Sequence, residues 1–144
     1  MRGIVYLIVS FLCLLTGAVI YLLYKPSSYF IQALFSVQTI QILQEKLSWC
    51  RTVFPNTSFI KYHLPDILWY QSLLLATHYV YHIKKLFPAG PVYYFTLALP
   101  FVLEILQFLH FIPGTFDWID IFWYITLLFL NYYIYIRRNK SDEN

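Results

Sequence analysis

An uncharged apolar run near the start of the chain limits the possible folds more than any other feature. The run extends from Gly3 to Tyr24, between Arg2 and Lys25, without a charged residue. About 20 apolar residues in a helix cross the hydrocarbon core of a bilayer. The run is also longer than the ~7–15 apolar residues expected in a secretory signal peptide. We therefore expect a retained first membrane span rather than a cleaved signal peptide.

Three further apolar runs follow, and each is bounded by prolines or basic residues. Proline is tolerated in the first turn of a helix, so Pro65 suits the start of the second span. Pro100 lies inside the third run, where it is expected to kink the helix and free the carbonyl of Thr96. We expect four spans, at about 3–24, 66–83, 92–112 and 116–136.

The composition supports a membrane protein. Hydrophobic residues make up 60% of the chain and charged residues only 12%, against about 25% charged residues in soluble domains. A soluble fold of 144 residues would not hide so much apolar surface. We therefore predict an all-α fold, a single integral membrane four-helix bundle over 1–144 that is surrounded by the lipid bilayer. The basic residues lie mainly at the ends of apolar runs, so no nucleic-acid partner is expected.

The connection between the first two spans contains an amphipathic segment at about 29–47. Its apolar residues recur at helical spacing: Phe30, Leu34, Val37, Ile40 and Leu43. Polar side chains occupy the opposite side of this predicted helix. One interpretation is a helix that lies in the membrane interface. The other is a helix packed on the end of the bundle, and the residues alone leave both open.

Positive charges predict the orientation of the spans. An even number of spans puts both termini on one side of the membrane. The basic residues of that side lie in short segments: Arg2, Lys84, Lys85, Arg137, Arg138 and Lys140. Those of the other side are spread through the long first loop. Short segments dense in Lys and Arg stay in the cytoplasm, so we expect both termini there.

With this orientation, six polar residues fall at the outer ends of three spans: Asp66, Glu104, Gln107, His110, Asp117 and Asp120. Counting along the third span places Glu104 roughly 12 Å below the outer surface. An ionised carboxylate at such a depth costs several kcal/mol unless it is paired, protonated or wetted, so it usually faces the bundle interior. Gln107 shares its face of the helix. The short turn 113–115 makes spans three and four antiparallel neighbours, so Glu104 can approach the two aspartates of the fourth span.

Structural and functional interpretations of these residues compete. In the structural interpretation, Asp66 and Asp117 stabilise helix N-termini, where carboxylates interact favourably with the free N–H groups and the helix dipole. Gln107 and His110 are then ordinary interhelical or interfacial residues. As a site, the carboxylates of Glu104, Asp117 and Asp120 would hold a divalent cation through oxygen ligands. They would also serve as general acid and base. No nucleophile is singled out, so the sequence does not say whether the protein is an enzyme.

The segment from Leu103-Glu104-Ile105-Leu106-Gln107 to Phe116-Asp117-Trp118-Ile119-Asp120 resembles the VanZ-like family of small bacterial membrane proteins. That family has an E-x-x-Q stretch, a short turn and a D-x-x-D element that opens the last helix. Leu64–Trp69 is similar to the family's motif before its second helix, and the resemblance covers about Leu64 to Tyr135. Two features depart from it. The turn 111–116 lacks the Arg that is common in the family. The family's Asn and Gly after the aspartates are replaced in this chain by aromatic residues and Thr126.

The resemblance implies a role at the bacterial cell envelope, in the cytoplasmic (inner) membrane. Some relatives are linked to low-level resistance to glycopeptide antibiotics of the teicoplanin type. Our first hypothesis is therefore an outward-facing carboxylate cluster that binds a lipid headgroup, a glycan or a cation, with a lipid-linked envelope component as its partner. The alternative is a non-catalytic accessory subunit that docks on a larger membrane protein complex. A transporter is less favoured, because four short spans without an internal repeat offer little for alternating access.

Overall fold

The computed structural model describes residues 2–25, 35–83 and 90–142. These residues form helices and no strand, which confirms the all-α class. The elements in chain order are α1 (Arg2–Tyr24), α3 (Val37–Lys46), α4 (Cys50–Val53), α5 (Ser58–Tyr62), α6 (Leu64–His78), a π-helical turn η1 (Tyr79–Ile83), α7 (Pro91–Phe108) and α8 (Trp118–Asp142).

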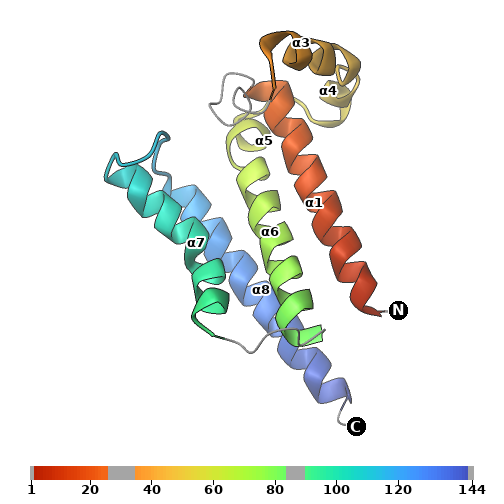
Figure 1. The fold of residues 1–144 in the computed structure, drawn as a ribbon, viewed down its shortest axis with the longest axis vertical. Helices are drawn as coiled ribbons and strands as arrows, with labels where there is room; N and C mark the ends of the chain where they lie inside the picture. Colours follow the sequence, from red (N-terminus) through yellow and green to blue (C-terminus); the bar gives the residue numbers. More distant parts are fainter. Residues whose placement is uncertain (1, 26–34, 84–89, 143–144) are drawn as a thin grey trace.

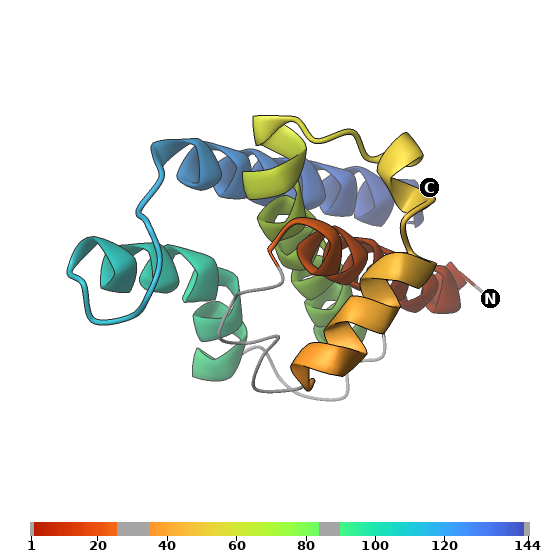
Figure 2. The same cartoon turned by 90° about the horizontal axis from the view of Figure 1, so that it is seen from above.

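The long helices pack around α6, which contacts α1, α7 and α8 (Figure 1). α1 and α6 run antiparallel side by side, and so do α7 and α8. The short helices α3, α4 and α5 lie at the end where α1 finishes and α6 begins (Figure 2). The N-terminus of α1 and the C-terminus of α8 lie at the opposite end.

The core lies where α6 meets α7 and α8. Tyr70 is fully buried, and its ring packs edge-on against Phe101 and Tyr124 at centroid distances of 6.2 and 5.2 Å. Its hydroxyl donates a hydrogen bond of 3.0 Å to the carbonyl of Leu97. That carbonyl lies in the helical turn before Pro100, which lacks a backbone donor. Tyr70 therefore joins α6 to α7 through both apolar and polar contacts.

Small and polar residues hold α1 close to α6. A Cβ atom on Gly17 would lie only 3.3 Å from the carbonyl oxygen of Pro65. The hydroxyl of Ser10 donates to the carbonyl of Ser72 at 2.9 Å, and the two hydroxyl oxygens lie 3.0 Å apart. Close backbone approach and interhelical hydrogen bonds are typical of helices that pack in a membrane. Ile20, one turn after Gly17 on α1, is completely buried.

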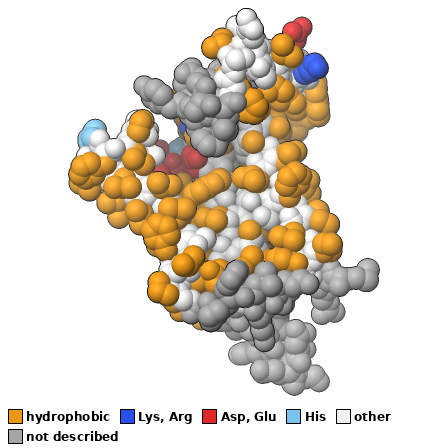
Figure 3. Space-filling model, viewed as in Figure 1, with side chains coloured by type: hydrophobic (Ala, Val, Ile, Leu, Met, Phe, Trp, Pro, Cys, Tyr) orange, Lys and Arg blue, Asp and Glu red, His pale blue; other side chains and the backbone are white. Residues whose placement is uncertain are grey.

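Two described helical segments, Gly3–Tyr24 and Pro91–Phe108, are long and apolar enough to cross a membrane. The apolar part of α8, Trp118–Ile134, is shorter. Large apolar side chains stand exposed along α1, α7 and α8, and Figure 3 shows hydrophobic side chains over much of one face. The described residues thus contain two candidate membrane spans, and the bundle of four membrane spans stays a prediction.

The predicted helix at 29–47 needs a correction. Residues 26–34, with Phe30 and Leu34, lie outside the described residues. α3 begins only at Val37, because Ser36 caps it: the Ser36 hydroxyl accepts a hydrogen bond of 3.3 Å from the backbone N–H of Thr39. α3 packs on the end of α1, with Ile40 buried and the Gln44 amide donating to the carbonyl of Leu22 at 2.8 Å. A helix packed on the end of the bundle was one of the two interpretations that the sequence left open for this segment.

Candidate functional site

Two carboxylates, that of Asp117 just before α8 and that of Glu104 on α7, accept hydrogen bonds from backbone N–H groups at the start of α8. Asp117 caps the helix, with its Oδ1 atom accepting a hydrogen bond of 2.8 Å from the N–H of Ile119. Oε2 of Glu104 accepts a hydrogen bond of 3.2 Å from the N–H of Asp117 itself. The free N–H groups and the positive end of the helix dipole favour carboxylates at this position. The structure thus brings Glu104 of α7 to the start of α8.

Glu104 has an unusual place on α7. Pro100 and Glu104 are the buried residues of that helix, and Glu104 is only 5% exposed. A carboxylate removed from water to this degree is costly unless hydrogen bonds or charges compensate it. The Asp117 N–H supplies one such hydrogen bond. A helix that otherwise presents apolar side chains to its surroundings therefore turns this carboxylate toward α8.

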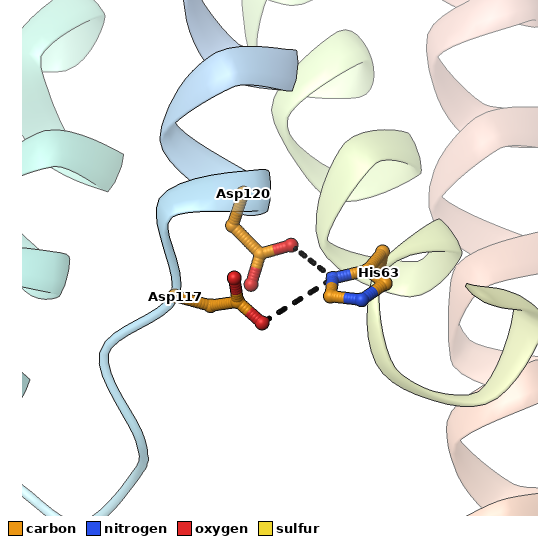
Figure 4. Close-up of side chains that lie close together, drawn as sticks. All are labelled: His63, Asp117 and Asp120. Atoms are coloured by element: carbon orange, nitrogen blue, oxygen red, sulfur yellow. Dashed lines mark hydrogen bonds and ion pairs between the residues drawn. The ribbon is translucent and has the colours of Figure 1, made fainter. Parts of the chain in front are cut away.

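His63 faces the aspartates of α8 from the junction between α5 and α6 (Figure 4). Its Nδ1 atom lies 2.7 Å from Oδ1 of Asp120 and 3.9 Å from Oδ2 of Asp117. The side chains of His63 and Asp120 are 12% and 9% exposed, whereas that of Asp117 is 36% exposed. The ring of Phe59 packs near both His63 and Trp123, at centroid distances of 6.0 and 5.9 Å. These contacts fix the imidazole against α8.

Asp66 and Lys25 lie close enough to these carboxylates to interact with them electrostatically. Asp66, in the first turn of α6, interacts electrostatically with Lys25, Asp120, Glu104 and His63. The ammonium of Lys25 lies over the ring of Tyr21, 4.9 Å from its centroid. Asp66 therefore belongs to the same electrostatic cluster, although it donates no atom to the close group around His63.

The turn after α7 explains two of the remaining sequence candidates. His110 has a φ angle of 61° and an exposed side chain. Its N–H donates to the carbonyl of Gln107, and the N–H of Phe111 donates to that of Leu106, which is a Schellman helix end. The helix therefore ends at Phe108 rather than at the predicted 112. His110 is placed here as a helix-ending residue.

Gln107 lies beneath the turn that leads to α8. Gly114 has a φ angle of 143°, and a Cβ atom there would lie 2.7 Å from Cδ of Gln107. Only glycine adopts this conformation at little cost and leaves room for the glutamine side chain. The structure thus gives Gln107 a role in packing the turn that positions Asp117.

The donor atoms of His63, Asp117 and Asp120 all lie within 4.8 Å of one another. Such a group can hold a metal ion after small side-chain movements, because bonds from nitrogen and oxygen to Zn²⁺ are about 2.0–2.2 Å long. The sequence predicted Glu104, Asp117 and Asp120 as ligands. All three meet at the start of α8, but Glu104 is engaged by the Asp117 N–H and His63 contributes the third converging donor atom.

Sequence reasoning missed His63, and a usable signal existed. His63 precedes Asp66 by three residues and lies directly before the Leu64-Pro65 start of α6. That position is at the membrane level where the other polar residues were expected. Figure 3 shows acidic side chains on the face of the molecule beside α7, with hydrophobic side chains around them.

Comparisons with protein-family models, with curated proteins and with solved structures found no match to this chain.

Proposed function

We propose that this protein is a multi-pass membrane protein that binds a divalent metal ion at one face of the membrane through His63, Asp117 and Asp120. The observation that carries the proposal is the convergence of their donor atoms within 4.8 Å, from the α5–α6 junction and the start of α8. The bound ion would in turn hold an anionic group of a lipid headgroup or of a lipid-linked envelope component.

The balance of charge supports a cationic ligand. Two basic side chains, Lys25 and His63, face a larger set of carboxylates: Asp66, Glu104, Asp117 and Asp120. Like charges held close together in a partly buried place repel one another, and the N-terminus of α8 offsets only part of this repulsion. A divalent cation between the carboxylates would replace repulsion with attraction.

The donor types support a first-row transition ion. Imidazole suits Zn²⁺, Fe²⁺ and similar ions, whereas sites for Mg²⁺ and Ca²⁺ consist of oxygen atoms alone. Three protein donors leave coordination positions for water or for an anionic ligand, as in zinc sites that act on substrates. A metal in such a site attracts and polarises a phosphoryl or carbonyl oxygen. The role that we propose for the site is binding alone.

The membrane assignment extends the two apolar helices to four spans. Under it, both termini lie in the cytoplasm, and the metal group lies at the outer face of a bacterial inner membrane. The resemblance to the VanZ-like family is consistent with this placement. The residues that carry the resemblance, Glu104, Gln107, Asp117 and Asp120, are those gathered around the start of α8.

The test is native mass spectrometry of the protein purified in a mild detergent and supplied with Zn²⁺ or Mn²⁺. We expect one bound ion in the wild type and its loss in His63→Gln and in Asp120→Asn. His110→Gln is the matched control, because His110 is an exposed histidine at the same end of the molecule. Retention of the ion by His63→Gln would refute the site. A stoichiometric protein partner without an ion would instead favour the accessory-subunit alternative.

A further inference from the structure

An open surface cavity lies at the same end of the molecule, between the end of α1 and the α4–α5 segment. Its volume is about 360 Å³, and Leu23, Tyr24, Arg51 and Asn56 line it. Ligand pockets in proteins usually measure about 300–1,000 Å³. None of its lining residues takes part in the group formed by His63 and the aspartates. The cavity is therefore a separate candidate site.

The chemistry of the lining is that of an amphiphile with a negative head. No carboxylate in the described part of the chain pairs with the Arg51 guanidinium. Guanidinium groups bind phosphate through two parallel hydrogen bonds, and the Asn56 amide adds further donors. Leu23 and the ring of Tyr24 supply an apolar wall on the side of α1. One part of the cavity thus suits a phosphate and the other part suits hydrocarbon.

The position of the cavity fits the headgroup layer of a bilayer. Leu23 and Tyr24 are the last residues of the apolar segment Gly3–Tyr24, which is long enough to span the hydrocarbon core. On the neighbouring segment, Trp49 and Val53 are 65% and 60% exposed. Tryptophan and basic residues concentrate at membrane–water interfaces. A lipid headgroup would therefore lie at the level of Arg51.

The walls of the cavity are tied together before any ligand binds. The hydroxyl of Tyr24 donates a hydrogen bond to the carbonyl of Phe54, which joins α1 to the segment after α4. The N–H of Phe54 donates to the carbonyl of Cys50 at 2.8 Å. A preformed pocket avoids part of the ordering cost that opposes binding.

We propose that this cavity binds the phosphate of an anionic phospholipid, with Arg51 and Asn56 as hydrogen-bond donors and Leu23 and Tyr24 against the start of the acyl chains. The proposal rests on α1 crossing the membrane. Its residues are not those of the metal group, so substitutions can test the two sites separately.

The test is lipid titration of the purified full-length protein, read by native mass spectrometry. The probes are phosphatidylglycerol and phosphatidylcholine. The wild type should retain phosphatidylglycerol preferentially. Arg51→Ala should weaken that binding by roughly tenfold, because it removes a charge-assisted contact. Asn56→Asp should weaken it at least as much, since it places a carboxylate beside the phosphate. Lys46→Ala, which removes an exposed basic residue outside the cavity, is the control and should bind as the wild type does.

Two results would overturn the proposal. One is equal retention of both lipids with no effect of Arg51→Ala or Asn56→Asp. The other is binding of inorganic phosphate that depends on Arg51 while lipid retention does not, which would identify free phosphate as the ligand. Arg51 is exposed, so its replacement should leave the fold intact. An unchanged metal stoichiometry in Arg51→Ala checks this, and it separates the failure of this site from failure of the metal group.

Discussion

Nδ1 of His63 and Oδ1 of Asp120 lie 2.7 Å apart, although 57 positions separate the two residues in the chain. Their contact ties the junction of α5 and α6 to the first turn of α8. The Asp120 side chain is only 9% exposed, so His63 is the partner that makes its burial tolerable. The same two atoms would bind the proposed metal ion, whose bonds to them would then replace their hydrogen bond.

Loss of one partner should therefore cost stability even without a metal. We expect His63→Ala to lower the free energy of unfolding by about 1–3 kcal/mol, because the Asp120 carboxylate stays buried without its partner. In a double-mutant cycle with Asp120→Ala, the two substitutions should couple by about 0.5–3 kcal/mol. Thermal unfolding in detergent measures both effects. Additive losses would show that the contact contributes nothing to stability.

The Glu104 side chain offers a matched pair of substitutions. Glu104→Gln keeps an oxygen that accepts from the Asp117 N–H, so the stability should change by less than about 1 kcal/mol. Glu104→Leu leaves that N–H without its acceptor at a part-buried position and should cost about 1–3 kcal/mol. Thermal unfolding of the two variants, compared side by side, separates the hydrogen bond from the charge. Equal stability of both variants would contradict a capping role for Glu104.

Gly114 should resist replacement for two separate reasons. Gly114→Ala forces a non-glycine residue to a φ angle of 143° and places its Cβ atom against Gln107. Strained backbone of this kind costs on the order of 1–3 kcal/mol. Adding Gln107→Ala should remove the collision but not the strain, so the double variant should recover only part of the lost stability in thermal unfolding. Full recovery would mean that the backbone is not strained.

A cysteine crosslink tests whether α1 is a retained helix of the fold. The hydroxyl oxygens of Ser10 and Ser72 lie 3.0 Å apart across the α1–α6 interface. In a background without native cysteines, Ser10→Cys with Ser72→Cys should oxidise to a disulfide in membranes, seen as a mobility shift on gels. A pair moved one residue along α1, Phe11→Cys with Ser72→Cys, is the control, because Phe11 is 61% exposed. Absence of the first crosslink would refute this packing.

The long helices could be predicted because their signals are local. Apolar runs bounded by prolines and basic residues predicted the starts of α1, α6, α7 and α8 to within two residues. Their ends were predicted less well: α6 gives way to the π-helical turn at Tyr79, α7 ends early at the left-handed His110, and α8 continues to Asp142. The approach of Glu104 to Asp117 followed from the short turn between two antiparallel helices. A carboxylate on an otherwise apolar helix costs free energy if it faces lipid. The free-energy cost alone therefore predicted that Glu104 faces the bundle interior.

The rest depends on contacts between distant segments. His63 lies at the end of a segment with no periodicity, so nothing local predicts that its imidazole faces α8. The apolar pattern predicted one continuous helix over 29–47, whereas residues 35 and 36 are not helical and the Ser36 cap starts α3 at Val37. The cavity beside Arg51 lies between the end of α1 and the α4–α5 segment, and no sequence pattern predicts a space between two separate segments.

The most direct test of the metal proposal is an equilibrium titration of the purified protein with Co²⁺, followed by visible absorption. Cobalt reports its ligands through d–d bands. We predict one equivalent of Co²⁺, displaced by Zn²⁺ but not by Mg²⁺, with the bands lost in His63→Gln and retained in His110→Gln. A spectrum of hexaaqua Co²⁺ throughout the titration, or bands unchanged in His63→Gln, would contradict a metal site formed by His63, Asp117 and Asp120.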